Sequence, residues 1–388
     1  MGSITATPPT QHPPSQLFAP LKLGNLTLAH RIVMAPMTRF RANDAHIPSP
    51  LAATFYGQRA SVPGTLLITE ATFISPRASG FPNTPGIFNG AQIAAWKTVT
   101  DAVHTKGSYI FLQLQALGRG ADAALLKTDP DGPFDFVSSS ATPIDSTQPV
   151  PRALSTSEIK SYIDDYATAA RNAMEAGFDG VEIHGALGFL IDQFTQDVSN
   201  RRDDAYGGSV ENRSRFALEV ARAVVDAIGP DRVGVRLSPY STFQGMKMAD
   251  PVPQFVHLVQ GLKDLGIAYL HLVESRVVGN EDVESQDEVV KAETLDVFVQ
   301  AWGGVGPVLL AGGFTPESAK KAVDDEFKGK DVAIVFGRHF TANPDLPFRI
   351  ANGIAFASYD RPTFYGGQEK GYTDFAFSDE FVRLQSKA

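Results

Sequence analysis

The sequence predicts an α/β protein, a single (β/α)₈ (TIM) barrel with an N-terminal hairpin cap and a long loop after the third strand. Eight short apolar runs alternate with helix-like segments, as a closed parallel barrel requires. The first run is not followed by the Gly-x-Gly-x-x-Gly turn of an open dinucleotide-binding sheet. Polar residues and glycines close most of the runs, which is typical of the C-terminal rim of such barrels.

Composition excludes several classes of function. The 388 residues exceed the usual ~150 of one domain, but α/β barrels often exceed ~250, and 43% hydrophobic content supports one large core. A net charge of −9 argues against binding to nucleic acid or anionic membranes. The chain has no cysteine, which excludes disulfides, thiol nucleophiles, cysteine-ligated zinc and iron–sulfur clusters.

The N-terminal segment differs from the rest of the chain. Residues 1–15 are rich in proline, threonine and serine, and they lack the basic and apolar regions of a signal peptide. We expect a disordered tail over 1–15 and one barrel domain over 16–388. No apolar run approaches the ~18 residues of a membrane span, so the sequence predicts a cytoplasmic protein without a membrane partner.

The predicted elements follow in order. Leu17 to Leu28, with its turn at Gly24-Asn25, predicts the hairpin, and Ser155 with Glu158 predicts a capping box. The predicted strands are 31–36, 64–73, 109–115, 181–184, 233–238, 268–273, 307–311 and 332–336. The predicted helices are 49–59, 91–106, 155–176, 210–228, 253–265, 292–302, 316–325 and 344–352, with an irregular insertion over 118–152 and a C-terminal tail.

Polar residues at the predicted strand ends suggest a bound ligand, because an unpaired buried polar group is costly. Strand four ends in His184, strand five carries Arg236, and strand three carries Gln113 and Gln115. The other strand ends supply Pro36, Met37 and Thr38, then Glu70 and Ala71, then Gly312 and Gly313, and finally Gly337 and Arg338. His184 can equally be a satisfied structural histidine, and Arg236 a structural ion-pair partner.

The chemistry of these groups suits flavin mononucleotide. Glycines at the ends of strands seven and eight can bind a phosphate through backbone N–H groups, and Arg338 can add a charged contact. Gln113 offers the donor and acceptor that pair with a pyrimidine-like edge, and Arg236 offers positive charge for an anionic reduced ring. The glycine pairs can also be simple turns.

Several motifs resemble the old yellow enzyme family of FMN-dependent ene reductases. The signature D-x-Y-G-G-S-x-E-N-R-x-R-F is nearly complete within 200–216, and the similarity extends over roughly 17–375. The chain resembles the fungal secondary-metabolism branch that includes chanoclavine-aldehyde reductases. Further matching segments are 35–38, 112–114, 118–119, 181–186, 336–338, 343–346 and 359–361.

The resemblance implies specific roles. His184 is the implied catalytic residue that holds a substrate carbonyl, NADPH is the transient reductant, and flavin N5 delivers hydride to the activated C=C bond. Gln115, Leu187, Phe189 and Tyr365 are the implied substrate-binding residues. The implied FMN-binding residues are Pro36, Met37, Thr38, Ala71, Gln113, His184, Arg236, Gly312, Gly313, Gly337 and Arg338.

The sequence departs from the family pattern above the flavin. Leu187 replaces the second carbonyl-binding Asn or His, Phe189 replaces the protonating tyrosine, and Gln115 replaces a common tryptophan. Three hypotheses remain: an ene reductase for an unsaturated carbonyl or iminium of a fungal metabolite, a redox-neutral isomerase, oxidase or cyclase, and a non-catalytic FMN-binding barrel. We expect a monomer or homodimer that binds a small molecule and has no metal site.

Overall fold

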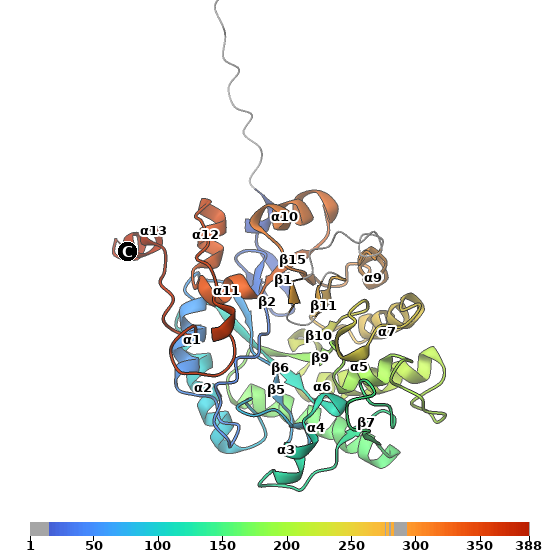
Figure 1. Ribbon diagram of the computed structural model, residues 1–388. Helices are drawn as coiled ribbons and strands as arrows, with labels where there is room; N and C mark the ends of the chain where they lie inside the picture. The colour runs from blue at the N-terminus through green and yellow to red at the C-terminus, as the bar shows by residue number, and fades with distance from the viewer. Residues whose placement is uncertain (1–14, 276, 279–280, 283–292, 388) are drawn as a thin grey trace, which may run out of the picture.

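The computed structural model describes residues 15–275, 277–278, 281–282 and 293–387, and its core is a closed parallel barrel (Figure 1). The predicted disordered tail, apart from residue 15, lies outside the described residues. β15 pairs with β3, and β4 pairs with β6, so the sheet closes on itself. The predicted fold class is confirmed. The barrel strands are β3 (Ile32–Met34), β4 (Leu66–Ile68), β6 (Tyr109–Gln115), β9 (Gly180–Gly185), β10 (Val233–Leu237), β11 (Tyr269–Val273), β14 (Val308–Ala311) and β15 (Val332–Phe336).

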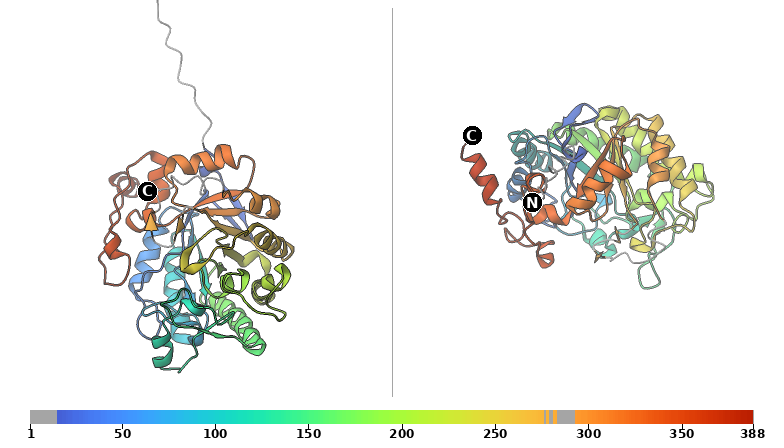
Figure 2. Two further views of the ribbon diagram at one scale, coloured as in Figure 1. Left: turned by 45° about the vertical axis from the view of Figure 1, so that its right-hand side comes forward. Right: turned by 90° about the horizontal axis from the view of Figure 1, so that it is seen from above.

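Helices surround the barrel because each presents one apolar face to the outer side of the strands (Figure 2). The capping box predicted at Ser155 and Glu158 opens α4. The helix predicted over 292–302 begins at residue 296, and residue 292 lies outside the described residues. The main helices are α1 (Leu51–Arg59), α2 (Gly90–His104), α4 (Thr156–Glu175), α6 (Val210–Ile228), α7 (Val252–Asp264), α9 (Asp296–Trp302), α10 (Pro316–Lys321) and α12 (Leu346–Asn352).

The predicted hairpin closes one end of the barrel. β1 (Leu21–Leu23) pairs antiparallel with β2 (Leu26–Leu28). Leu21, Leu23 and Leu28 are buried in one cluster with inward-facing residues of the strands. The hairpin therefore seals this end with apolar side chains and leaves the other end for polar chemistry.

The second predicted strand, 64–73, is wrong as one continuous element. It breaks after β4 and resumes as β5 (Thr72–Phe73), which pairs with the end of β6. At the break, the Thr69 hydroxyl accepts the Gln113 backbone N–H, and the Glu70 N–H donates to the Tyr56 hydroxyl. Side chains thus replace ladder bonds where the strand departs from the barrel.

Several short helices and strands were not predicted from the sequence. The insertion at 118–152 contains η3 (Gly118–Gly120), α3 (Ala123–Thr128) and β7 (Val137–Ser138), which pairs with β8 (Arg152–Ala153). All six residues of α5 (Leu190–Thr195) are buried, so this helix has no amphipathic period to detect. Other elements are α11 (Arg338–Ala342), α13 (Asp379–Gln385), β12 (Val277–Val278), β13 (Glu281–Asp282), η1 (Gln16–Phe18), η2 (Pro76–Ala78), η4 (Pro230–Arg232), η5 (Phe243–Gly245), η6 (Ala322–Glu326) and η7 (Arg361–Thr363).

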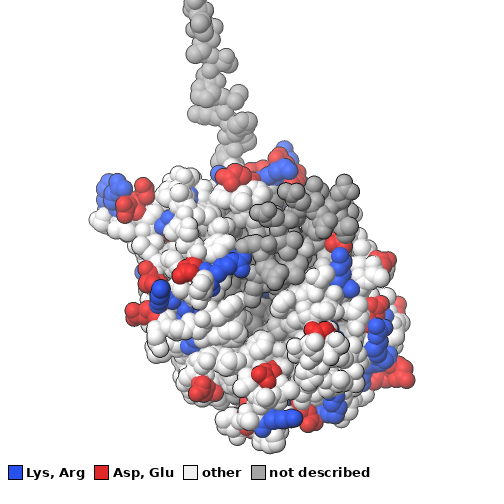
Figure 3. All heavy atoms as spheres, viewed as in Figure 1, with Lys and Arg blue, Asp and Glu red and all other residues white. Residues whose placement is uncertain are grey.

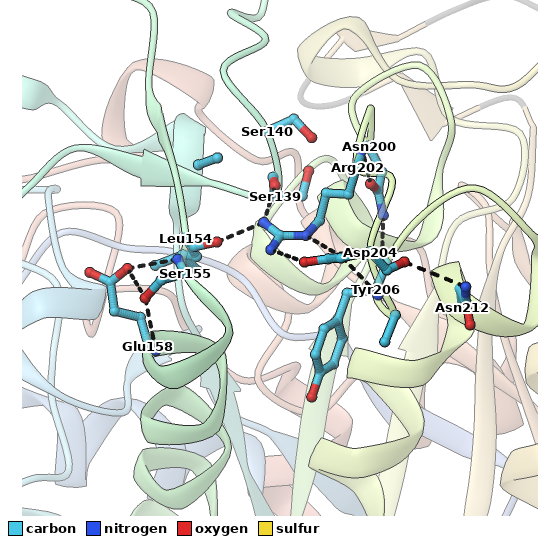
Figure 4. A network of polar contacts seen from close by, with 12 residues as sticks. Ser139, Ser140, Leu154, Ser155, Glu158, Asn200, Arg202, Asp204, Tyr206 and Asn212 are labelled. Atoms are coloured by element: carbon cyan, nitrogen blue, oxygen red, sulfur yellow. Dashed lines mark hydrogen bonds and ion pairs between the residues drawn. The ribbon is translucent and has the colours of Figure 1, made fainter.

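The most diagnostic sequence motif has a structural role (Figure 4). Arg202 forms a two-pronged ion pair with Asp204 and donates to the backbone carbonyls of Ser139 and Leu154, at 2.8 and 2.7 Å. Asn200 donates to the carbonyls of Phe194 and Tyr206. These contacts fasten the insertion after β6 to the connection between α5 and α6.

Charges on the surface are mixed. Lys and Arg lie among Asp and Glu on the face shown in Figure 3, without a broad patch of one sign on the described part of that face. Among the described helices, none is both long and apolar enough to cross a bilayer.

We predict that Arg202→Ala lowers the free energy of unfolding by about 2–4 kcal/mol, because two carbonyls and Asp204 lose a half-buried charged partner. Urea unfolding measures the change. The neighbouring exposed Arg201 is the matched control, and Arg201→Ala should change stability by less than about 0.5 kcal/mol. Equal effects of the two substitutions would contradict a structural role for the Arg202 contacts.

Candidate functional site

The site begins with two residues placed side by side by strand register. His184 on β9 is directly opposite Arg236 on β10, and Arg236 is in turn opposite His271 on β11. Residues at matching positions of parallel strands point to the same side of the sheet. Ile183 and Val235, which precede them and point the other way, pack in the core cluster with the helices, so His184 and Arg236 face the inside of the barrel.

The electrostatics of this pair favour a ligand. Burial, and then the charge of Arg236, hold the pKa of His184 well below its usual value, so the imidazole is neutral at physiological pH. Burial also lowers the pKa of the Arg236 guanidinium, while Glu182 opposes that shift. Among the described residues, His184 Nδ1 and Arg236 Nε are buried without a hydrogen-bond partner. Such atoms need a partner, because an unsatisfied buried polar group costs about 1–3 kcal/mol.

Strand β6 adds two glutamines. Gln113 and Gln115 are both buried and, being two residues apart, lie on one face of the strand. Gln113 Nε2 donates to Glu182 Oε1 at 2.7 Å. Gln115 is in register with Phe73 of β5, so it lies further toward the rim than Gln113.

The ends of β14 and β15 form a backbone cradle. Gly313 has a left-handed φ of +67°, and a methyl group there would meet only Arg338 Nη2, at 3.7 Å. A methyl group on Gly337 would make ordinary contacts with Ala35 and Met37. Gly313, Gly337 and Arg338 thus converge beside the end of β3. At position 312, glycine is required by packing, because a Cβ there would lie 2.3 Å from the Glu274 carboxylate.

The first two strand ends lie in the same region. Pro36, Met37 and Thr38 follow β3, next to Gly337, and Ala71 is buried between β4 and β5. Glu70 accepts the Arg39 backbone N–H at 3.2 Å, and burial raises the pKa of this carboxyl to about 7.

Aromatic side chains form a wall over His184. The Phe189 ring lies edge-on to His184, with centroids 5.0 Å apart, and it also contacts Phe81. Phe81 contacts Phe40, which contacts Tyr365 at 5.4 Å. Tyr365 is 42% exposed, so the wall runs from the buried histidine to the surface.

Leu187 belongs to the same wall and has a strained backbone. It packs against the buried cluster of Phe73, Leu117 and Phe189, and its φ is +56°. Its N–H donates to the Ser238 hydroxyl, and its carbonyl accepts from Gln244 Nε2. Asn and His tolerate positive φ better than leucine does, so the backbone conformation at this position is unfavourable for leucine.

Several residues around the site are not among those predicted from the sequence. Glu182 was visible as a charge inside an apolar strand, which is a usable signal. Phe40, Phe81 and Ser238 lie in loops and Gln244 lies in the short η5, and their positions near the site follow only from the packing of distant segments. The remaining residues that we predicted lie at the rim, with Tyr365 at its outer edge.

The residues present fit FMN. The unpartnered nitrogens of His184 and Arg236 supply polar contacts at the centre of the rim. Gln113 supplies a side-chain amide. The backbone at Gly313 has open space in front of it, and the Arg338 guanidinium lies beside this space. An isoalloxazine with a phosphorylated side chain needs this combination of a polar ring edge and a phosphate cradle.

Comparisons with known proteins agree with this geometry. Residues 16–356 match the model of the NADH:flavin oxidoreductase / NADH oxidase family. Chanoclavine-I aldehyde reductase fgaOx3 of Penicillium roqueforti is 60% identical over 370 residues, which is 95% of this chain and 98% of the relative. A probable inactive reductase, easA of Epichloe festucae var. lolii, is 53% identical over 96% of this chain and 98% of its own length.

A solved structure shows the same architecture. Old yellow enzyme from Pichia sp. AKU4542 superposes with a TM-score of 0.85 at 36% identity, covering 94% of each chain. The fold, the family match and the arrangement of the residues at the rim lead to one conclusion: the chain belongs to the NADH:flavin oxidoreductase / NADH oxidase family, as an FMN-dependent oxidoreductase of the old yellow enzyme type.

Proposed function

We propose that this protein reduces an activated C=C bond, in an α,β-unsaturated carbonyl or iminium of a fungal secondary metabolite, at the expense of NADPH. The observation that carries the proposal is the neutral, buried His184 with a free ring nitrogen beside Arg236, under an aromatic wall. The 60% identical relative is named a chanoclavine-I aldehyde reductase, which supports this class of substrate.

The chain's own residues have distinct tasks in this proposal. When bound, FMN supplies a two-electron carrier between the nicotinamide and the C=C bond. Neutral His184 donates a hydrogen bond to the substrate carbonyl, and Arg236 places positive charge against the reduced flavin. Phe189 and Leu187 exclude water and pack against an apolar substrate. Gln115 and Tyr365 contact its polar edge and its outer end.

A second candidate function is favoured by two side chains, since Phe189 has no hydroxyl and Leu187 has no amide. Leu187 and Phe189 give the site neither a second carbonyl donor nor a proton source at these positions. Losing one such donor typically costs ~10²–10³ in rate, and losing a positioned acid ~10²–10⁴. A redox-neutral reaction, such as an isomerisation, needs neither net NADPH consumption nor a strong acid. The relative named as a probable inactive reductase keeps the non-catalytic hypothesis open as a third candidate.

One experiment separates the three candidates. Purified holoprotein is mixed with NADPH without oxygen, and the flavin absorbance is followed. Bleaching, followed by rapid recovery when cyclohexenone is added, supports the reductase. Bleaching without recovery, together with turnover of an alkaloid intermediate and no net NADPH loss, supports the redox-neutral enzyme. A flavin that NADPH does not bleach supports the passive binder.

We predict that the double variant Leu187→Asn with Phe189→Tyr raises kcat/KM for cyclohexenone by about 10²-fold or more, because it restores a carbonyl donor and an acid. Asparagine also suits the positive φ at position 187. Steady-state NADPH oxidation measures the gain. Phe81→Tyr adds a hydroxyl elsewhere in the same aromatic wall and should leave kcat/KM unchanged. A double variant with wild-type activity would refute the assigned roles of both positions.

We predict that Arg338→Met weakens FMN binding at least tenfold but leaves riboflavin binding within about twofold, because riboflavin lacks the phosphate. Fluorescence titration of the apoprotein with each flavin measures both affinities. Arg222, exposed on α6, is the matched control, and Arg222→Met should alter neither affinity. Equal weakening of both flavins by Arg338→Met would mean that Arg338 supports the fold rather than the phosphate.

A further inference from the structure

The barrel contains a buried polar layer below His184 and Arg236. Glu182 lies two residues before His184 on β9, and its side chain is fully buried. Its carboxylate accepts hydrogen bonds from Gln113 Nε2 at 2.7 Å and from the Tyr269 hydroxyl at 3.0 Å. His271 Nδ1 lies 2.8 Å from the same carboxylate. These donors come from β6 and β11, which are not adjacent strands, so the carboxylate bridges the barrel interior.

The backbone is adapted to this layer. Gly234 of β10 is in register with Glu182 on one side and with Tyr269 on the other. A Cβ at Gly234 would lie 2.1 Å from the Tyr269 ring. Glycine therefore opens the space through which the tyrosine reaches the carboxylate.

The surrounding groups determine the protonation states of Glu182 and His271. Burial alone would raise the pKa of Glu182, but the hydrogen bond from His271, the charge of Arg236 and the hydrogen bond from Gln113 hold that pKa below its usual value. Burial lowers the pKa of His271 more than Glu182 raises it. The carboxylate is therefore ionised and the imidazole neutral, with its Nδ1–H donating to Glu182. The charge that compensates Glu182 is Arg236, one layer nearer to the rim.

The carboxylate also fixes the orientation of the Gln113 amide. An ionised carboxylate only accepts hydrogen bonds, so Gln113 must turn Nε2 toward Glu182 and Oε1 away from it. At the rim, Gln113 thus presents an acceptor. The pyrimidine-like edge of oxidised flavin carries one N–H donor, at N3, between two carbonyl acceptors, and an acceptor from the protein matches only that N–H.

We propose that Glu182 is a positioning residue for the cofactor, which holds the Gln113 amide with its oxygen toward flavin N3–H and balances the charge of Arg236. The inference rests on the proposed placement of FMN at the rim. Glu182 then influences both the affinity of the protein for FMN and the reduction potential of the bound FMN. Without the carboxylate, the amide is free to turn, and the full charge of Arg236 favours the anionic reduced flavin over the oxidised one.

The first test is a double-mutant cycle on FMN affinity. Glu182→Gln and Gln113→Met should each weaken FMN binding to the apoprotein at least tenfold, measured by fluorescence titration. If Glu182 acts through Gln113, the double variant binds FMN as weakly as Gln113→Met alone. Additive losses would show that the two residues act separately and would overturn the inference.

The second test is the reduction potential of bound FMN, measured with reference dyes. Glu182→Gln should favour the reduced flavin about tenfold, which raises a two-electron potential by about 30 mV. Asp345→Asn is the control, because Asp345 is an equally buried carboxylate that binds Arg349 and Ser378 outside the barrel. It should lower stability and leave the potential unchanged. An unchanged or lowered potential in Glu182→Gln would mean a merely structural role.

A third measurement uses the wild-type chain and does not depend on the folding of a variant. The apoprotein is titrated with FMN and with N3-methyl-FMN. An amide oxygen held toward N3–H should favour FMN at least tenfold, and equal affinities would overturn the inference. Failure of the wild-type protein to bind FMN at all would overturn the placement of the cofactor together with this inference. Normal FMN binding with no effect of Glu182→Gln would overturn the inference alone.

Discussion

Closure of the sheet between β4 and β6 is the constraint on which the rest of the structure depends. In an open sheet, inward-facing residues of distant strands would lie on a flat surface and could not meet. Because β4 pairs with β6 and β15 with β3, alternate residues of eight strands converge on one axis. Glu182 can then bond His271, two strands away on β11, as well as Gln113 on the adjacent β6.

The interior of the barrel is divided into two halves. β3, β4, β14 and β15 contribute small and branched apolar side chains to the interior, and the hairpin packs against them. β6, β9, β10 and β11 contribute glutamine, glutamate, histidine, arginine and tyrosine, besides the apolar Phe111 of β6. Grouping the polar residues on neighbouring strands lets each satisfy the others, which lowers the cost of burying them. It also leaves His184 and Arg236 with open bonding capacity at the rim.

The motif that identifies the family and the residues that decide the chemistry are different sets. Arg202, Asp204 and Asn200 hold the insertion and the connection after α5 in place, at a distance from the barrel axis. Phe189 lies against His184, and Leu187 packs against the cluster that contains Phe189. Motif similarity therefore establishes fold and cofactor, while the reaction depends on the residues that surround His184.

The sequence by itself determined the barrel, the hairpin, the capping box at Ser155 and the strand ends that carry His184, Arg236 and Gln113. These features depend on local periodicity and on the parallel alignment of strands, which neighbouring residues encode. Only the tertiary structure decided the break in the second strand, the buried helix α5, the aromatic wall from Phe189 to Tyr365 and the bonds of Glu182. Each of these depends on contacts between segments distant in the chain, whose geometry is fixed only when the barrel closes.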